Sequence, residues 1–402
     1  MAILQPSHRV ARLRPTAVNS VLSEVRDLQS QGVKLVSLLR GEPDFPTPPH
    51  IVEAAERALR QGRTGYADNR GEAPLRAAIA AKLGRDNGLD YDPDSEILVT
   101  TGATFGIYAA LTALLNEGSE VLLPEPVYDA YHSPVLLAGG QVRSVPCQIR
   151  AGRFALDVDD LEAAWTPQSS VLLLNTPWNP TGAVFSRAEL EAIGEFVCRR
   201  NLALLCDEIY EALIYDGIAH VSPASLSPEL RQRTVLVNSL SKTYSMTGWR
   251  AGYCAAPAGI IRAMFLVLQQ SSRGPATFVQ DAAAAALAGP QRCVEEMLAA
   301  YAARRAQVCE ALGGLDGCCV VVPQGGFFAM VDVRGLGISS LEIRRRLMHE
   351  HGVVTMHGSA YGPSGEGTLR VSFGAGGAAL SAGLDRLRAG LASFHPVKAV
   401  SP

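Results

Sequence analysis

The chain has 402 residues, of which 48% are hydrophobic and 19% are charged, and its formal net charge is −3. This length suits two lobes that share a large core, and the composition is that of a folded protein rather than a disordered one. The small negative charge gives no reason to expect nucleic acid or an anionic membrane surface as a partner. One basic cluster, 344–346, lies in a pattern with helical spacing, and we interpret it as a solvated helix face.

The cysteines and histidines do not show the spacing of a metal site. Cys318 and Cys319 are adjacent, which suits neither zinc ligation nor an ordinary disulfide, and none of the eight cysteines forms a Cys-x-x-Cys pair. His349 and His351 are two positions apart and would not share a helix face. The first residues lack the apolar region of a signal peptide, and no run is long enough to span a bilayer. We therefore expect no metal, no membrane partner and a cytoplasmic location.

In chain order, the first expected elements are a helix over 17–31 and a short strand over 34–39. The stretch 40–49 is rich in proline and contains a glycine, which excludes regular structure there. Helices are expected from residue 50 to the break at Gly62 and around 75–83. These elements precede the part of the chain in which strands and helices alternate.

From residue 97 onward, apolar strands alternate with amphipathic helices, a pattern typical of a mostly parallel sheet with helices on both faces. In open sheets of this kind, ligands bind outside the carboxyl ends of the strands. The strands are expected at 97–100, 120–123, 171–175, 203–206 and 235–238, and the residues that follow them include Gly102, Ala103, Thr104, Tyr128, Asn179, Asp207, Tyr210 and Lys242. A polar residue at the end of one strand is explained by a capped turn. Because several strands end in this way, the pattern predicts one ligand site at their carboxyl ends.

The C-terminal third is expected to form a second lobe. A long helix over 294–312 could link the two lobes, and separate strands and helices follow it: strands at 319–322, 327–331, 353–356 and 368–373, and a helix near 341. In the last strand Leu369, Val371 and Phe373 face one side, so Arg370 faces the other. Taken alone, this pattern predicts a solvated arginine unless a carboxylate binds there.

Lys242 follows a short apolar strand and lies among small and hydroxylic residues. Desolvation at such a place lowers the pKa of the amine, and a neutral amine can form a Schiff base with a carbonyl compound. The side chains of Ser239, Ser241 and Arg250, together with backbone amides, suit a phosphate. The combination suggests pyridoxal phosphate (PLP). The alternative from these residues alone is an ordinary surface turn. A P-loop is excluded, because Ser241 stands where that motif requires glycine.

Five ordered motifs resemble the class I aminotransferases, the aspartate aminotransferase-like branch of the fold-type I PLP enzymes, and especially its bacterial-type subgroup. The motifs are Gly41-Glu-Pro-Asp-Phe45, Asn179-Pro-Thr-Gly182, Asp207-Glu-Ile-Tyr210, Ser239-Leu-Ser-Lys242 with Gly248-Trp-Arg250, and Gly365-Glu-Gly367 before Arg370. The resemblance covers nearly the whole chain. It implies an α/β fold with a large, doubly wound, mostly parallel-sheet domain and a smaller α+β domain. We expect an N-terminal arm and part of the small domain at 1–45, the PLP-binding domain at 46–290 and the small C-terminal domain at 291–402.

The resemblance also implies roles for single residues. Lys242 would bind PLP covalently and transfer a proton, Asp207 would pair with the pyridine nitrogen, and Arg370 would bind the substrate α-carboxylate. Around these three, the resemblance implies that Tyr210 and Asn179 bond to the phenolate oxygen, that Tyr128 stacks on the cofactor ring and that Gly41 lies at the substrate. It also implies a homodimer in which Tyr66 of the partner subunit reaches the phosphate. The phosphate site of the chain itself would consist of Gly102, Ala103, Thr104, Ser239 and Arg250.

The implied reaction is ping-pong transamination through pyridoxamine phosphate, between an amino acid and a 2-oxo acid. Elimination or amino acid oxidation at the same site, and a PLP-sensing regulator without turnover, are the alternatives. Several residues depart from the family pattern. Thr104 stands where aspartate-specific relatives have a lysine, Arg273-Gly-Pro275 stands where the family usually has Ser-Asn-Pro or Thr-Asn-Pro, and Trp178 replaces a small or polar residue. Arg40 precedes the Gly-Glu-Pro loop on the substrate side. We hypothesise that Arg273, alone or with Arg40, meets a distal acidic or polar group of the substrate. A surface arginine is the alternative. The sequence does not indicate the amino donor or acceptor.

Overall fold

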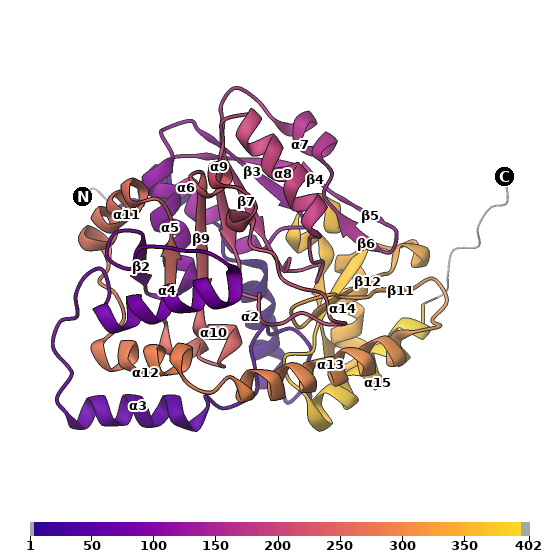
Figure 1. Cartoon of the computed structure of the whole chain (residues 1–402). Helices are drawn as coiled ribbons and strands as arrows, with labels where there is room; N and C mark the ends of the chain where they lie inside the picture. The colour runs from indigo at the N-terminus through magenta and orange to yellow at the C-terminus, as the bar shows by residue number, and fades with distance from the viewer. Residues whose placement is uncertain (1–3, 395–402) are drawn as a thin grey trace.

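The computed structural model describes residues 4–394, which form two lobes, each built around its own sheet. In Figure 1 the lobe with the C-terminal strands and helices, orange to yellow, lies at the right. The larger sheet has the order β2-β10-β9-β8-β7-β3-β4. Its strands are β2 (Ile97–Thr100), β3 (Glu120–Glu125), β4 (Gln141–Pro146), β7 (Ser169–Asn175), β8 (Ala203–Asp207), β9 (Thr234–Ser239) and β10 (Gly252–Ala255).

The larger sheet is mostly parallel, as expected, but one strand is reversed. β4, β3, β7, β8 and β9 pair in parallel, whereas β10 runs antiparallel to both β9 and β2. The sequence analysis did not predict β10, because its four residues follow the Lys242 loop so closely that no separate apolar pattern can be recognised. The expectation of a doubly wound α/β domain is confirmed.

Helices cover both faces of the larger sheet. Because side chains alternate along a strand, Leu98 packs with the cluster around α5 (Gly102–Leu114) and α11 (Ala258–Ser271), whereas Ile97 and Val99 pack with α4 (Ala73–Asn87) and α12 (Thr277–Ala288). Further along the second face lies α8 (Arg187–Arg199), and α3 (Pro49–Arg60) packs on the outside of α12 (Figure 1). Strands buried on both faces have the continuous apolar runs seen in the sequence.

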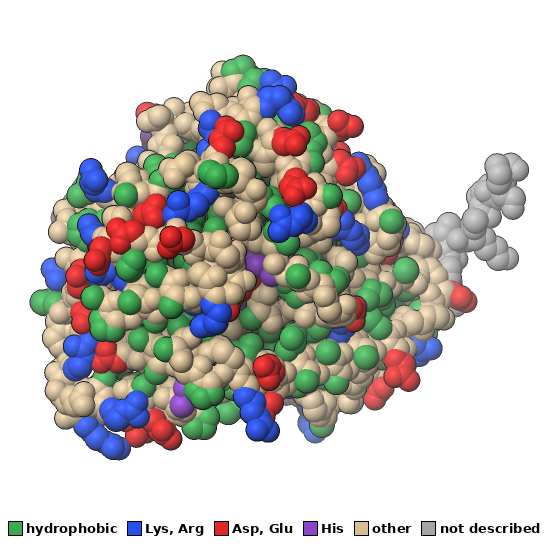
Figure 2. Space-filling view, viewed as in Figure 1, with side chains coloured by type: hydrophobic (Ala, Val, Ile, Leu, Met, Phe, Trp, Pro, Cys, Tyr) green, Lys and Arg blue, Asp and Glu red, His purple; other side chains and the backbone are tan. Residues whose placement is uncertain are grey.

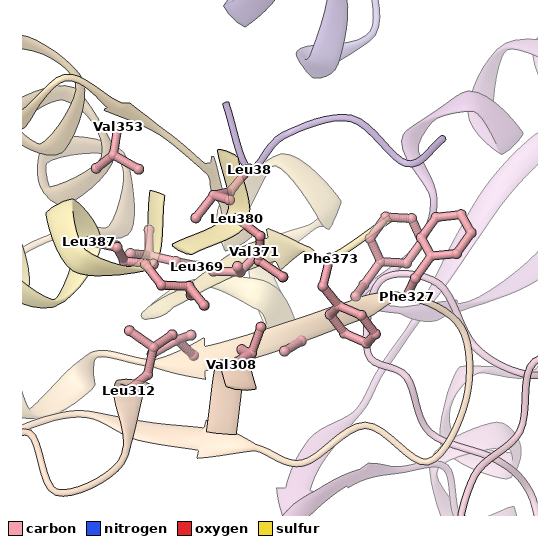
Figure 3. Close-up of a cluster of buried hydrophobic side chains, with 14 of the residues drawn as sticks. Leu38, Val308, Leu312, Phe327, Val353, Leu369, Val371, Phe373, Leu380 and Leu387 are labelled. Atoms are coloured by element: carbon pink, nitrogen blue, oxygen red, sulfur yellow. The ribbon is translucent and has the colours of Figure 1, made fainter. Parts of the chain in front are cut away.

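The smaller lobe has an antiparallel sheet of β11 (Cys319–Val321), β12 (Phe328–Asp332), β15 (Thr368–Ser372) and β14 (Met356–His357), in that order. Figure 3 shows Leu369, Val371 and Phe373 on the face that packs against Val308 and Leu312 of α13 (Arg292–Leu312) and against α15 (Gly377–Ala392). The expected alternation in β15 is therefore observed. Arg370, between these apolar residues, points away from this cluster.

The N-terminal arm belongs to the smaller lobe by its contacts. β1 (Val36–Ser37) pairs in parallel with β13 (Val353–Val354), and Val21 and Val25 of α2 (Ala17–Ser30) pack near Met348 of α14 (Ser340–His351). The strand expected over 353–356 is two short strands, β13 and β14. α13 runs from one lobe to the other (Figure 1). The domain limits at 45/46 and 290/291 stay a prediction.

The interpretation of 344–346 as a solvated face was wrong for Arg344. This side chain is 4% exposed, and its Nη1 donates to Glu24 Oε2 of α2 at 2.6 Å. The helix periodicity places Arg344 toward the N-terminal arm, where a charge is tolerated only because it is paired. Arg345 remains exposed.

On the face drawn in Figure 2, positively and negatively charged side chains are interspersed. Within residues 4–394 no helix has the length and apolar character needed to cross a membrane. The eight cysteines are free thiols, and Cys206 and Cys254 are buried.

A substitution in the smaller core tests the packing in Figure 3. Leu369→Ala removes a side chain that is fully buried. We expect the free energy of unfolding to fall by about 2 to 5 kcal/mol, because the lost apolar contacts leave a cavity. Urea unfolding followed by circular dichroism measures this change. Leu266→Ala is the matched control, because Leu266 is 56% exposed and should change stability by less than about 0.5 kcal/mol. Equal effects of the two substitutions would contradict the packing.

Candidate active site

A cavity of about 440 Å³ lies between the lobes, outside the carboxyl ends of β7, β8 and β9. Both lobes contribute to it, because Gly41 and Arg370 come from the smaller one and Lys242 from the larger one. The sequence-predicted residues that line this cavity are Gly41, Ala103, Thr104, Tyr128, Asn179, Asp207, Tyr210, Ser239, Lys242, Arg250 and Arg370. The structure thus brings together residues that are spread over more than three hundred positions.

Lys242 lies on α10 (Leu240–Thr243), a single turn that begins where β9 ends. Its Nζ donates a hydrogen bond to the carbonyl of Gly41 at 2.8 Å, and Gly41 itself has no room for a Cβ, which would lie 2.5 Å from a ring carbon of Phe328. Burial, helped by the positive charges of Arg250 and Arg370, lowers the pKa of Lys242 to about 8. The amine is therefore partly neutral near physiological pH and can act as a nucleophile or base.

Asp207 is the last residue of β8 and is 4% exposed. Its Oδ2 accepts a hydrogen bond from Tyr131 Oη at 2.6 Å, and its Oδ1 accepts one from the Ile209 N–H at 3.1 Å. Burial raises the pKa of Asp207 to about 6, and the two hydrogen bonds oppose this shift. A buried carboxylate at this place suits a cationic partner. The sequence analysis missed Tyr131, although its position three residues after Tyr128 was a usable signal.

Gly102 and Arg250 form a tight corner at the start of α5. Gly102 has a φ of +76°, and a Cβ there would lie 2.5 Å from Arg250 Nη2. Arg250 also has a left-handed backbone, with φ +57°, which costs about 1 to 3 kcal/mol and is typical of functional sites. Its Nη1 donates to the carbonyl of Thr247 at 3.0 Å. The first N–H groups of α5 have no partners within the helix, so a guanidinium and backbone donors converge where an anion fits.

Arg370 is buried, with 3% exposure, so the solvated arginine expected from the strand pattern alone was wrong. Its Nη2 donates to the carbonyl of Leu39 at 2.9 Å and its Nη1 to Asn179 Oδ1 at 3.3 Å. The guanidinium lies 4.3 Å from the ring centre of Phe328. Its Nε is buried and has no hydrogen-bond partner within residues 4–394. Such an unsatisfied donor is costly, and a carboxylate would satisfy it.

Hydrogen bonds hold Asn179 at the cavity, and packing against other aromatic rings holds Tyr210 and Tyr128. Asn175 Oδ1 accepts the Asn179 N–H at 2.7 Å, and Asn175 Nδ2 donates to the carbonyl of Asp207 at 2.9 Å, which ties β7 to β8 at the cavity. Tyr210 is buried and packs edge to face on Phe327. Burial raises the pKa of the Tyr210 phenol, so it stays protonated and can donate. Tyr128 packs edge to face on Tyr131 with ring centres 5.4 Å apart.

Three other candidates lie outside this cavity in the single chain. Tyr66 is 87% exposed, and the Arg273 guanidinium stacks on its ring at 4.3 Å. Arg40 has a side chain that is 67% exposed and lies 3.8 Å from Glu42. The expectation that Tyr66 and Arg273 enter the site of another subunit concerns an assembly and stays a prediction.

The sequence analysis also missed one wall of the cavity. Thr16, Val18 and Asn19, at the start of α2, line it together with Asp129. The Ala17 N–H donates to Asp129 Oδ2 at 2.7 Å. Burial raises the pKa of Asp129, while this hydrogen bond and the charge of Arg370 oppose the shift. No local pattern links residues that are 112 positions apart.

A second polar cluster lies behind the sheet. Glu208, next to Asp207, points to the opposite face, where it accepts a hydrogen bond from Ser222 and contacts His220, both at 2.7 Å. Ligating atoms of Glu208, Glu211 and His220 lie within 4.8 Å of one another. Lys82 forms an ion pair with Glu211 and so supplies positive charge to this cluster.

The cavity fits PLP on several independent counts. A partly buried lysine with a lowered pKa, a buried carboxylate and a corner of positive charge at a helix start suit the aldehyde, the pyridine nitrogen and the phosphate of this cofactor. The unsatisfied Nε of Arg370 provides a place for a substrate carboxylate beside them.

Comparison with known proteins agrees with this site. The family model for aminotransferase class I and II matches residues 33–384. The chain is 40% identical to aromatic-amino-acid aminotransferase 2 of Thermococcus litoralis over 370 residues, which are 91% of this chain and 94% of the relative. It is 37% identical to an aspartate aminotransferase of Geobacillus stearothermophilus over 387 residues, 94% and 97% of the two chains. The structure of an aspartate aminotransferase from Rhizobium meliloti superposes with a TM-score of 0.94 at 34% identity, covering 98% of this chain and 100% of that one.

The fold and the lysine-centred cavity define a PLP-dependent enzyme of fold type I. The chain belongs to the aminotransferase class I and II family, and it is a transaminase. The family and the fold expected from the sequence motifs are thereby confirmed.

The lowered pKa of Lys242 has a measurable consequence. We expect the rate at which the apoenzyme takes up PLP to rise with pH, with its midpoint near 8, and to level off above it, because only the neutral amine attacks a carbonyl. Stopped-flow absorbance over a pH series measures this rate. Lys242→Ala, which lacks the amine, is the control for binding without a covalent bond. A rate that continues to rise toward pH 10, as for an ordinary lysine, would contradict the assignment.

Proposed function

We propose that this transaminase moves the α-amino group of an amino acid to a 2-oxo acid in two half-reactions, with Lys242 as the residue that binds PLP covalently and transfers the proton. The observation that supports this most is the convergence of Lys242 with the buried Asp207 and Arg370 in one cavity. PLP, when bound, supplies the ring that accepts the electrons of the broken Cα–H bond. The remaining chemistry belongs to side chains of this chain.

Arg370 positions the substrate. Its buried guanidinium binds the α-carboxylate through two donors, and Asn179 and the carbonyl of Leu39 fix its orientation. This contact holds the Cα–H group toward Lys242, so that the proton is transferred over a short distance. A pKa of about 8 allows Lys242 Nζ both to take the proton and to return it.

Other residues hold the cofactor in the orientation that this transfer needs. Asp207, fixed by Tyr131, would pair with the pyridine nitrogen and keep it protonated. Arg250, Ser239 and the first amides of α5 would hold the phosphate, Tyr210 and Asn179 would bond to the phenolate oxygen, and Tyr128 would stack on the ring. Elimination or oxidation would use many of the same residues, but no contact in the cavity favours either over transamination.

We also propose a homodimer in the cytoplasm in which Tyr66 and Arg273 enter the cavity of the partner subunit. The pair supports this, because an 87% exposed tyrosine stacked by an arginine presents an aromatic ring and a positive charge to a neighbour. There Tyr66 would contact the phosphate, and Arg273 would meet a distal polar or acidic group of the substrate. The relatives named above act on aspartate or aromatic amino acids, so the side-chain pocket has to be tested on both classes.

A substitution of Arg370 tests the substrate assignment. For Arg370→Lys we expect kcat/KM for amino acids to fall by about 10² to 10³-fold, because the buried bidentate contact is lost. The change in cofactor absorbance on adding an amino acid, without a 2-oxo acid, measures the first half-reaction. PLP uptake should be unchanged and serves as the internal control. An unchanged kcat/KM would remove Arg370 from the site, and loss of ammonia without a need for a 2-oxo acid would favour elimination.

Mixing of subunits tests the proposed exchange of residues. Lys242→Ala and Tyr66→Ala proteins are prepared separately, and mixed dimers are formed from them. If Tyr66 serves the partner's cavity, one site of the mixed dimer combines a native Lys242 with a native Tyr66, and activity should recover to about half of the wild-type value per dimer. If Tyr66 serves its own cavity, the mixture should not recover, and if it serves neither, the Tyr66→Ala protein should be fully active by itself. Arg273→Ala should in addition lower kcat/KM for dicarboxylic substrates, and an unchanged value would assign Arg273 to the surface.

A further inference from the structure

The charges in the cavity leave one group without a role in the proposed function. The cations that line it are Lys242, Arg250 and Arg370, and the anions are Asp207 and Asp129. PLP, its phosphate and the substrate α-carboxylate account for the three cations and for Asp207. Asp129 remains: Arg370 and His132 lie near enough to act on its carboxyl, but it forms no ion pair within residues 4–394.

Asp129 lies on the cavity wall at the start of α2, and we infer that the substrate side chain meets this wall. It follows Tyr128, the residue expected to stack on the cofactor ring, and it shares the cavity with Val18 and Asn19 of α2. Its Oδ2 is held by the Ala17 N–H at 2.7 Å, at the start of α2, where the helix dipole favours a carboxylate. Its Oδ1 is buried and has no hydrogen-bond partner within residues 4–394. The carboxyl group of Asp129 is thus fixed in place, with only one of its two oxygens hydrogen-bonded.

The rest of this wall is apolar or uncharged. Val18, Ile107, Pro134 and Phe328 line the cavity with Thr104. A second carboxylate on the substrate would therefore approach the carboxyl group of Asp129, and in a partly buried site two like charges repel strongly. An aromatic or aliphatic side chain meets no such repulsion and gains from burial.

We propose that Asp129 makes this transaminase selective for amino acids with neutral, aromatic or aliphatic side chains and against those with a second carboxylate. The inference rests on the proposed function, because it takes Arg370 as the α-carboxylate site. Asp129 acts as a specificity-determining residue, and Arg273 of a partner subunit, where it enters the cavity, opposes this selection.

The test is Asp129→Asn in the holoenzyme. Asparagine has nearly the same shape, and its Oδ1 can still accept the Ala17 N–H, so α2 stays in place while the charge is removed. Two ligands, succinate and 3-phenylpropionate, each offer one carboxylate to Arg370. Their dissociation constants are measured from the shift in cofactor absorbance, and the rates of the first half-reaction are measured with aspartate and phenylalanine.

We expect Asp129→Asn to tighten succinate binding at least about tenfold and to raise kcat/KM for aspartate by a similar factor, while the values for 3-phenylpropionate and phenylalanine change less than about threefold. Asp90→Asn, at an exposed position outside the cavity, should change neither the two dissociation constants nor the two kcat/KM values. In an Arg273→Ala background the wild-type preference against succinate should increase.

Equal effects of Asp129→Asn on both ligands, or no effect on either, would overturn the inference. If the variant does not fold, the wild type still decides, because succinate binding as tight as that of 3-phenylpropionate would also overturn it. If no amino acid reacts but the two ligands differ as expected, the proposed transamination fails while the selectivity of the cavity stands.

Discussion

The structure depends on bringing five charged side chains together in one cavity between two lobes. Neither lobe holds a complete site, because Lys242 and Asp207 end strands of the larger sheet whereas Arg370 lies on the smaller one. Removal from water lowers the pKa of the lysine and raises that of the aspartate, which brings both toward neutrality. The apolar layers on both faces of the larger sheet and on one face of the smaller sheet hold these groups at fixed positions.

Much of this arrangement could be predicted from the sequence, for a definite physical reason. Parallel strands covered on both faces need continuous apolar runs, and ligands bind at their carboxyl ends, so Asp207, Asn179 and Lys242 were recognisable by position. Motif resemblance then supplied Arg370, which the strand pattern alone had assigned to solvent. The buried state of Arg370 follows from its place between β12 and β14, and that pairing depends on contacts distant in sequence.

The features that the sequence analysis missed share one property. β10, the Tyr131–Asp207 hydrogen bond, the Ala17–Asp129 contact and the burial of Arg344 each depend on a partner far along the chain or on the reversal of one strand. Local periodicity describes which face of an element is apolar, but it does not say which element will cover a polar residue on that face. Arg344 shows this well, because its helical pattern was recognised while its partner in α2 was not.

One helix connects the two lobes in a way that has a mechanical consequence. The start of α2 is bonded to Asp129 of the larger lobe, and less than three turns later Glu24 of the same helix is bonded to Arg344 of the smaller lobe. Any rotation of one lobe against the other therefore acts on the backbone hydrogen bond at Ala17, together with other bonds between the lobes such as that from Lys242 to Gly41. If the bond at Ala17 breaks, the wall of Thr16, Val18 and Asn19 moves away with the smaller lobe, so opening of the lobes and widening of the cavity become the same motion.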